Sequence, residues 1–377
     1  MSFTLHINGE KWRTHLRAVV NAVTSASGSS PVPVIKGNGY GLGQELLGAT
    51  AMDLGADTIA VGTVFEIESV VGVTQGDIVV LEPCDPRDAN AAVKWREIGE
   101  KFYAGRIICT VASREALIEL VNGAGGVRII LEARSSMVRF GFTESELIGV
   151  LGNPEIRAAL ATGRIFIEGI SIHLPIVRTA PDAHAVEVMR WAGLWERETA
   201  VWEGHSPPAP VIWMSHCSDA ELATIRQSVS ELIVRMRVGS RLWLGDRSAF
   251  SASGTVLAVH PVSEGVKVGY CQRSAGKNAT LIAVSGGTAH GIGLSAPSPT
   301  TSLRQRVTSF GIGALDAAGR AMSPFSIGRK QRWFAEPPHQ HVSMLWLNNE
   351  SVLPQVGDQL SAEVRFTTTR FDSVSII

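Results

Sequence analysis

Short apolar runs alternate with helical patterns along the first two thirds of the chain. Eight of these runs predict strands, and several are continuous enough in Val, Ile and Leu to be parallel strands covered on both faces. They are Pro33–Gly39, Thr58–Gly62, Asp77–Glu82, Arg106–Thr110, Val127–Ala133, Gly169–Leu174, Pro210–His216 and Met236–Leu244. The segments between them predict helices over Glu10–Ser25, Gln44–Leu54, Ser113–Asn122, Thr143–Leu151, Ala183–Ala200 and Ser218–Gln227. Eight strands interleaved with helices favour an α/β fold with a (β/α)8 TIM-type barrel. A doubly wound open sheet is the alternative, but no GxGxxG follows the first strand.

The pattern changes after about Asp246. Short strand-like runs separated by Gly, Ser, Pro and Thr follow, and no long amphipathic helix is visible. The runs are Gly254–Val262, Val266–Gln272, Thr280–Ser285, His341–Leu347 and Gln359–Phe366. We therefore expect the barrel in residues 1–245 and a separate all-β domain in residues 246–377, with a long loop at Ser295–Ser302.

Composition narrows the functional classes. The 377 residues carry 34 Lys and Arg against 35 Asp and Glu, so there is no basic excess for binding nucleic acid. Four dispersed cysteines (Cys84, Cys109, Cys217 and Cys271) form no CxxC pair, and no HExxH or other metal-ligand motif occurs. No apolar run has the length of a signal peptide or a membrane span, so we expect a cytoplasmic protein without a membrane partner.

The first predicted strand ends in a lysine among glycines, IKGNGYGLG, from Ile35 to Gly43. Barrel enzymes carry their sites at the carboxyl ends of the strands, so this segment is a candidate for chemistry. An ammonium in an apolar strand is costly unless it is neutralised, and lysine forms Schiff bases with carbonyl compounds. The alternative is a lysine that pairs with a carboxylate at the barrel mouth. The glycines around Tyr40 allow the backbone to approach a ligand closely.

This segment resembles the VKANAYGHG motif of the alanine racemase family, which uses pyridoxal 5′-phosphate (PLP). The resemblance implies that Lys36 holds the cofactor covalently and that Tyr40 binds its phosphate. Ser135–Gly141, SSMVRFG, resembles the family's DTGMxRxG motif. That match implies that Arg139 lies near the cofactor's phenolic oxygen and contacts the substrate. The alternative is a surface arginine, but the position of Arg139 straight after a buried strand favours the barrel mouth.

Three further motifs follow in the family's order. GISIHLP resembles the segment whose histidine stacks on the pyridine ring, which implies that role for His173. Cys217–Ser218 resembles an Asn-Ser pair, so Ser218 would bind the phosphate; the alternative is a helix cap. MRVGS resembles VRPG, so Arg237 would face the pyridine nitrogen, while the backbone of Gly239 and Ser240 would bind phosphate. A positive arginine there disfavours a proton on the ring nitrogen, which suits proton transfer without transamination.

The β-domain half of the motif set departs from the family. The family's second base is a tyrosine in GYADG, and here the segment reads GTAHG, so Thr288 stands in its place. An aliphatic hydroxyl is a much poorer acid or base than a phenol of pKa ~10. The chain has only 3 tyrosines, at positions 40, 103 and 270, and none takes over this place. His290 is the candidate substitute, and a loop histidine without a catalytic role is the alternative.

Two other positions differ in a related way. Glu132 stands where the family has a carbamylated lysine, and it could orient Arg139 with its negative charge. In the family's MDQ motif, Met344 is kept as a substrate contact and the aspartate is Leu345.

The resemblance as a whole implies a PLP-dependent isomerase. The expected reaction is the interconversion of the L and D forms of a small amino acid by transfer of the Cα proton, with Lys36 as one acid–base group. A homodimer is expected, because the family's sites are completed across the subunit interface. Two alternatives remain: other PLP chemistry on an amino acid, such as decarboxylation, and a PLP-binding homologue without activity.

Overall fold

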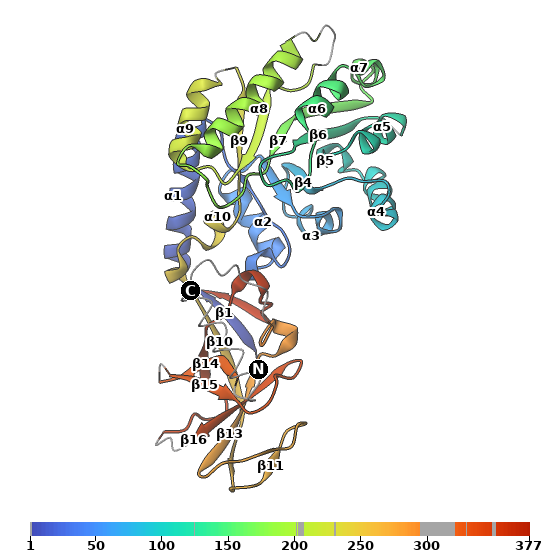
Figure 1. Ribbon diagram of the computed structural model, residues 1–377. Helices are drawn as coiled ribbons and strands as arrows, with labels where there is room; N and C mark the ends of the chain where they lie inside the picture. The colour runs from blue at the N-terminus through green and yellow to red at the C-terminus, as the bar shows by residue number, and fades with distance from the viewer. Residues whose placement is uncertain are drawn as a thin grey trace. The chain divides into compact units, whose positions relative to one another are not determined.

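The computed structural model describes residues 2–377 except 124, 201, 203–206, 230, 295–320, 329 and 349–351. The loop predicted at Ser295–Ser302 lies outside the described residues. The chain divides into two compact units (Figure 1). One, which we call the barrel unit, contains residues 14–39 and 43–245. The other, which we call the β unit, contains the residues up to Arg13, residues 40–42 and residues 246–377.

Eight parallel strands form the core of the barrel unit within its described residues. Their order is β2-β9-β8-β7-β6-β5-β4-β3. The ring closes because Val34 pairs with Ala60 of β3, where the Ile35 N–H donates to the Ala60 carbonyl at 2.6 Å. The strands are β2 (Val32–Pro33), β3 (Thr58–Val61), β4 (Asp77–Pro83), β5 (Ile107–Val111), β6 (Val127–Ala133), β7 (Ile165–Ile172), β8 (Val211–Ser215) and β9 (Ile233–Val238). The predicted (β/α)8 barrel is therefore confirmed.

Helices cover the outside of this ring (Figure 1). They are α1 (Gly9–Ser27), α2 (Gln44–Asp53), α3 (Ile67–Val70), α4 (Ala89–Gly99), α5 (Arg114–Asn122), α6 (Glu144–Leu151), α7 (Pro154–Ala161), α8 (Ala183–Ala200), α9 (Asp219–Ser228) and α10 (Ser240–Leu244). Short polar side chains start several of them, because such a side chain can accept a bond from a free N–H of the first turn. Ser113 does so for α5, as the sequence predicts, and Ser218 does so for α9, which is the alternative to its expected phosphate role.

The inside of the barrel is filled by apolar side chains from successive strands. The buried cluster consists of Val32, Val34, Ala60, Val79, Ile108, Ile130 and Trp213. Small and branched side chains pack well in this position, and each buried branched one contributes about 1.5–3 kcal/mol. Near the amino ends of the strands, Arg128 bridges Asp77 and Glu168 at 2.7 and 2.6 Å. The apolar filling leaves the carboxyl ends of the strands to carry polar side chains.

The first and last predicted strands are shorter than expected. The strand predicted over Pro33–Gly39 ends at Pro33, and the chain turns at Gly37 and Gly39, where φ is 61° and 60°. A side chain at Gly39 would lie 2.6 Å from the Gln44 nitrogen, so this turn requires glycine. The strand predicted over Met236–Leu244 ends at Val238. After Gly239 the same apolar residues form helix α10, which buries Leu242, Trp243 and Leu244.

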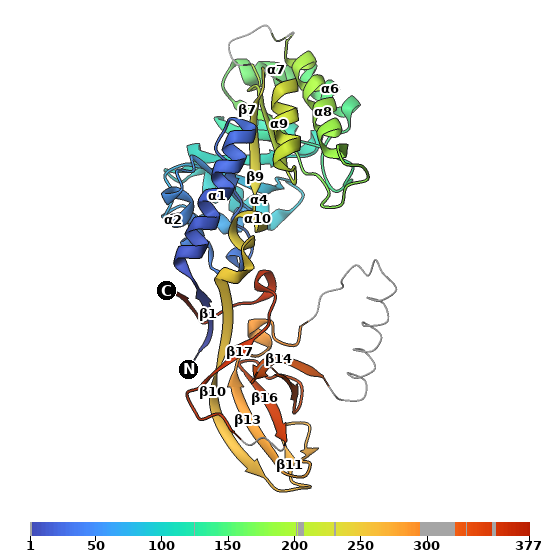
Figure 2. The same cartoon turned by 90° about the vertical axis from the view of Figure 1, so that its left-hand side faces the viewer.

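The β unit is a mostly antiparallel sheet. Its long strand β10 pairs with β13 and β17 and also with β1. Strands β13, β16, β15, β14, β17 and β10 follow one another, and β10 also pairs with β13, so these six strands form a ring. Figure 2 shows β10 curving beside β13. The bounds are β1 (Phe3–Ile7), β10 (Phe250–Val262), β11 (Lys267–Val268), β12 (Arg273–Ser274), β13 (Ala279–Ser285), β14 (Met322–Ile327), β15 (Lys330–Phe334), β16 (Val342–Asn348), β17 (Gln359–Ala362) and β18 (Ser373–Ile376). This confirms an all-β region after the barrel.

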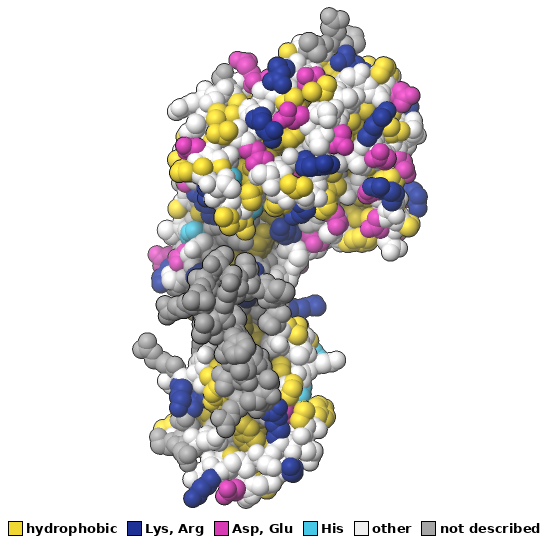
Figure 3. Space-filling view, viewed as in Figure 1, with side chains coloured by type: hydrophobic (Ala, Val, Ile, Leu, Met, Phe, Trp, Pro, Cys, Tyr) yellow, Lys and Arg dark blue, Asp and Glu magenta, His cyan; other side chains and the backbone are white. Residues whose placement is uncertain are grey.

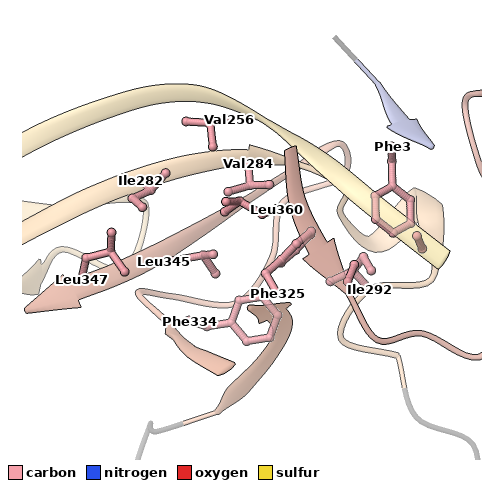
Figure 4. Close-up of a cluster of buried hydrophobic side chains, with 12 residues drawn as sticks. Phe3, Val256, Ile282, Val284, Ile292, Phe325, Phe334, Leu345, Leu347 and Leu360 are labelled. Atoms are coloured by element: carbon pink, nitrogen blue, oxygen red, sulfur yellow. The ribbon is translucent and has the colours of Figure 1, made fainter. Parts of the chain in front are cut away.

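Strand β1 was not foreseen by the sequence analysis, which assigned residues 1–245 to the barrel. It pairs antiparallel with β10 and parallel with β18, so both ends of the chain join the β sheet. Phe3 anchors it, with its ring stacked on Phe371 at 5.2 Å and edge-on to Phe325 at 6.1 Å. Figure 4 shows Phe3 and Phe325 with the other buried side chains of this core. Burial of these large rings fixes a strand that is distant in sequence.

The surface carries no segregation of charge on the face seen in Figure 3. Basic and acidic side chains are interspersed over the barrel unit there. None of the described helices combines the length and the apolar character needed to cross a membrane.

Candidate active site

Four of the predicted site residues meet at the carboxyl ends of the barrel strands. Lys36 follows β2, His173 follows β7, Arg237 belongs to β9 and Arg139 follows β6. Their charges act on one another: Arg139 and Arg237 both lower the pKa of Lys36 and that of His173. Parallel strands end at the same rim of a barrel, so residues far apart in sequence come together here.

Lys36 is held as a weakened base. Partial desolvation is the first cause that lowers its pKa, although its side chain still reaches solvent; the positive charges of Arg139 and Arg237 follow. Glu66 acts in the opposite direction. The Glu66 carboxylate is fixed beside the lysine turn by the N–H groups of Gly37 and Gly62, at 3.1 and 2.8 Å. A lower pKa gives Lys36 a larger share of the neutral amine, which is the nucleophilic form.

Arg237 lies buried in the barrel with an unmet donor. Its side chain is 5% exposed, and Nη2 donates to the Ile172 carbonyl at 3.1 Å. Within the described residues, its buried Nε has no hydrogen-bond partner. Burial lowers its pKa, while the negative charge of Glu132 raises it. An unpartnered buried donor costs roughly 1–3 kcal/mol, so this atom marks a place for an acceptor.

Glu132 is the buried acidic partner of these arginines. Ser171 donates a hydrogen bond to its carboxylate. Burial raises the pKa of Glu132, and Arg237, Ser171 and Arg139 counteract this effect. The predicted electrostatic link between Glu132 and Arg139 is present, and Arg237 acts more strongly than Arg139.

His173 is kept neutral. Desolvation, followed by the charges of Arg237 and Arg139, lowers its pKa to about 3. Its Nδ1 is 2.7 Å from the Ser215 hydroxyl, and its ring is 5.1 Å from that of His216 in an edge-on arrangement. The Ser135 hydroxyl donates to the His173 carbonyl at 2.5 Å. A neutral imidazole held in this way can pack against an aromatic ring without adding charge.

The residues expected to bind phosphate differ in whether their hydrogen-bond donors are already used within the protein. Helix α10 starts at Ser240 after Gly239 with no side-chain cap, and the N–H groups of Leu242 and Trp243 donate to the Gly239 carbonyl. Phosphate binding by the backbone of Gly239 and Ser240 stays a prediction. The Ser218 hydroxyl instead donates to Glu221 at 2.8 Å and accepts from the Glu221 N–H at 3.3 Å. Its hydrogen is therefore already used inside the barrel unit.

The remaining candidates belong to the β unit. Tyr40 is buried in a left-handed conformation with φ 57°, and residues 40–42 group with this unit. Met344 lies in β16 opposite Ala283 of β13, and Thr288 begins a 3₁₀ turn that ends at His290. The proximity of these residues to Lys36 stays a prediction.

His290 is fully engaged within its own unit. It is 5% exposed, and its Nδ1 accepts from the Gly287 N–H at 3.1 Å. Since that bond requires a lone pair on Nδ1, the proton lies on Nε2, which is 3.1 Å from Asp372. The ring also meets Phe3 edge-on at 5.6 Å. Accepting a proton would require His290 to lose the bond from Gly287.

Sequence reasoning missed several residues that build the barrel site. Ser215 and His216 are the last two residues of the predicted strand Pro210–His216, and Glu66 follows the strand predicted to end at Gly62. Short polar residues at the carboxyl end of a buried strand are a usable signal for the first two. Nothing local marks Glu66, because its partners are backbone groups of another loop.

Comparison with known proteins shows the family of the chain. The profile described as "Alanine racemase, N-terminal domain" matches residues 7–199, half of the chain. The chain belongs to the alanine racemase family. No curated protein sequence matches it.

Solved structures of alanine racemases share this fold. The enzyme of D-cycloserine-producing Streptomyces lavendulae is 19% identical with a TM-score of 0.62, over 96% of this chain and 87% of that one. The enzyme of E. faecalis is 18% identical with a TM-score of 0.61, over 96% and 88%. The enzyme of Bartonella henselae, solved with covalently bound pyridoxal phosphate, is 15% identical with a TM-score of 0.61, over 97% and 91%. At such identities the likeness establishes the alanine racemase fold.

Proposed function

We propose that this chain is a PLP-dependent isomerase that interconverts the two mirror forms of a small amino acid. The observation that carries the proposal is the buried Arg237, whose Nε lacks a partner among the described residues, beside a neutral His173. A pyridine nitrogen is an uncharged acceptor that would satisfy this donor. Membership of the alanine racemase family supports the choice of cofactor.

The barrel residues fit the other parts of PLP as well. Lys36 offers an amine with a lowered pKa for covalent attachment. His173 offers a neutral ring face, and the uncapped start of α10 at Gly239 and Ser240 offers N–H donors to a phosphate. Tyr40 and Ser218 are proposed as further phosphate contacts on the resemblance alone.

The residues then divide the chemistry between them. When bound, PLP would withdraw electrons from the substrate and so acidify its Cα proton. Lys36 would take or return that proton on one face, and its lowered pKa favours such transfer near neutral pH. Arg237 would keep a proton off the ring nitrogen, which limits side reactions such as transamination. Arg139 would bind the substrate and the phenolic oxygen.

The opposite face needs a second acid–base group. Thr288 and His290 are the proposed candidates, with Met344 as a substrate contact, and a homodimer would supply them from the partner subunit. This part of the proposal rests on the resemblance. The hydrogen bonds of His290 favour a structural role for it.

One experiment tests first the binding of the cofactor and then the reaction. Purified protein is mixed with PLP, and its absorption spectrum is recorded before and after borohydride reduction, followed by peptide mass analysis. We expect a visible band that reduction abolishes and a cofactor mass on the Lys36 peptide. Chiral chromatography of single L-amino acids in deuterated buffer then measures mirror-form production and Cα deuterium. A reduced adduct elsewhere, or no exchange with any amino acid, would refute the proposal.

A second candidate is PLP chemistry that needs one acid–base group, such as decarboxylation, or cofactor binding without turnover. It is favoured by Thr288 in place of a tyrosine and by the engaged nitrogens of His290. Production of an amine, or exchange of the Cα proton with retention of configuration, would support this second candidate if no racemic product forms. A large gain in racemisation in Thr288→Tyr would indicate that the missing phenol limits the reaction.

A further inference from the structure

A carboxylate already occupies the start of helix α9. Glu221 Oε2 accepts from the Ser218 N–H and from the Ser218 hydroxyl, both at 2.8 Å. Arg178, in the loop after β7, clamps the same carboxylate through Nε at 3.2 Å and Nη2 at 3.0 Å. The Arg178 Nη2 also donates to the His216 carbonyl at 3.1 Å. The loop after β7 is thereby tied to the end of β8 and to α9.

Glu221 is buried and ionised, whereas the Arg178 side chain that clamps it is 36% exposed. Glu221 is 4% exposed; burial alone would raise its pKa, but the bonds from Arg178 and Ser218 lower it overall. The carboxylate therefore stays negative at neutral pH. Buried His184 lies beside it, with Nδ1 at 4.0 Å from Oε1, and the His184 Nε2 has no hydrogen-bond partner among the described residues. The Nδ1 atom that faces Glu221 also lies 3.2 Å from the His216 carbonyl.

We propose that Glu221 is a built-in competitor for the cofactor's phosphate at Ser218, an inference that rests on the proposed function. The Ser218 N–H and hydroxyl are donors that an anion could use, and here the Glu221 carboxylate of the same capping box accepts from both. A phosphate arriving at Ser218 meets a negative charge and two donors that are already used. Glu221 thus lowers affinity for the phosphorylated cofactor and leaves the pyridine end, built from His173 and Arg237, unaffected.

Comparison of PLP with pyridoxal isolates the effect of Glu221 on the phosphate. Dissociation constants for PLP and for pyridoxal, which lacks the phosphate, are measured by absorbance, and binding of inorganic phosphate by calorimetry. We expect E221Q to bind PLP and inorganic phosphate at least about tenfold more tightly than the wild type, since two like charges a few ångströms apart repel each other even near a protein surface. Pyridoxal binding stays within about twofold, because nothing near the ring changes. E221A, which also frees both Ser218 donors, gives an equal or larger gain.

Two controls separate the charge of Glu221 from its other roles. Glu146 forms the same capping arrangement with Thr143 at the start of α6, and E146Q, which removes the charge of such a carboxylate away from Ser218, should leave phosphate affinity unchanged. The double variant E221Q/R178Q keeps the gain if Glu221 itself repels the phosphate. Loss of the gain in the double variant would assign it to a freed Arg178 and overturn the proposal. Circular dichroism and urea unfolding check that each variant is folded.

The outcomes also separate this inference from the proposed function. If no variant forms a lysine-bound PLP band, the proposed function fails, and the inorganic phosphate series still tests the competition. Unchanged phosphate affinity in E221Q and E221A overturns the inference whether or not PLP binds. Equal gains for PLP and pyridoxal would also overturn it, because the effect would then not act on the phosphate.

Discussion

The barrel rim and the Thr288 turn of the β unit handle their polar groups in opposite ways. At the rim, Arg237 keeps a buried donor that has no partner in the described part of the chain, and Lys36 has a lowered pKa. In the turn, His290 uses both ring nitrogens, and Asp372 receives bonds from His290 and from the Phe3 N–H at 2.8 Å. Unmet polar groups are costly in a native fold, so they mark where a ligand completes the structure. By this criterion the rim is prepared for a ligand, and the turn is already complete by itself.

The largest effect should come from removing the amine at the rim. Lys36→Met should lower any PLP-dependent turnover at least about a thousandfold, since it removes both the covalent attachment and an acid–base group. The measurement is the initial rate of mirror-form production by chiral chromatography. Lys101→Met, at an exposed position of the same unit, serves as the control. A Lys36→Met variant that kept more than a tenth of the rate would break the contrast between the two regions.

The next largest effect should be the loss of stability when the buried carboxylate Glu132 loses the positive charge of Arg237. Arg237→Met should destabilise the protein by about 3 kcal/mol, because Glu132 remains buried with a raised pKa and little compensation. Urea unfolding followed by circular dichroism gives the free energy of unfolding. The double variant Arg237→Met with Glu132→Gln should recover much of the loss. Additive losses in the double variant would show that the two side chains are not coupled.

The pH dependence of stability should report the neutral histidine of the rim. The pKa of His173 is about 3 in the fold against ~6.5 in the unfolded chain, so between these values the unfolded state binds more protons. Stability then falls as pH drops below about 6.5, with a slope from this group of at most about 1.4 kcal/mol per pH unit. Because the ring is partly exposed, about 1–2 kcal/mol in total is expected. Unfolding of His173→Gln between pH 7 and 4 should show a shallower slope than the wild type, and identical slopes would contradict the assignment.

The smallest effect is expected in the turn. His290→Gln should cost about 1 kcal/mol of stability, because it loses one of two hydrogen bonds, and should leave turnover within about threefold. Thermal unfolding and initial rates are measured on the same preparations. A hundredfold loss of rate at unchanged stability would instead make His290 the second acid–base group and remove the difference between the two regions.

Much of the fold was readable from local pattern. The strand runs Val127–Ala133 and Asp77–Glu82 and the cap at Ser113 follow from side-chain periodicity and short-range hydrogen bonds, which depend only on neighbours in sequence. The lysine motif was readable for the same reason, because its residues are contiguous. The predicted strand Met236–Leu244 was wrong in its second half, since Gly239 lets the chain change from strand to helix while keeping the same residues buried.

The sequence by itself determined the barrel pattern of strands and helices, several of the residues at the strand ends and the family that the motifs resemble. Only the tertiary structure decided that Phe3–Ile7 pairs with Phe250–Val262, that Glu66 supports the lysine turn and that Glu221 takes the hydrogen of Ser218. The physical reason is range: periodicity and capping act within a few residues, whereas strand pairing and charge coupling join residues that only folding brings together.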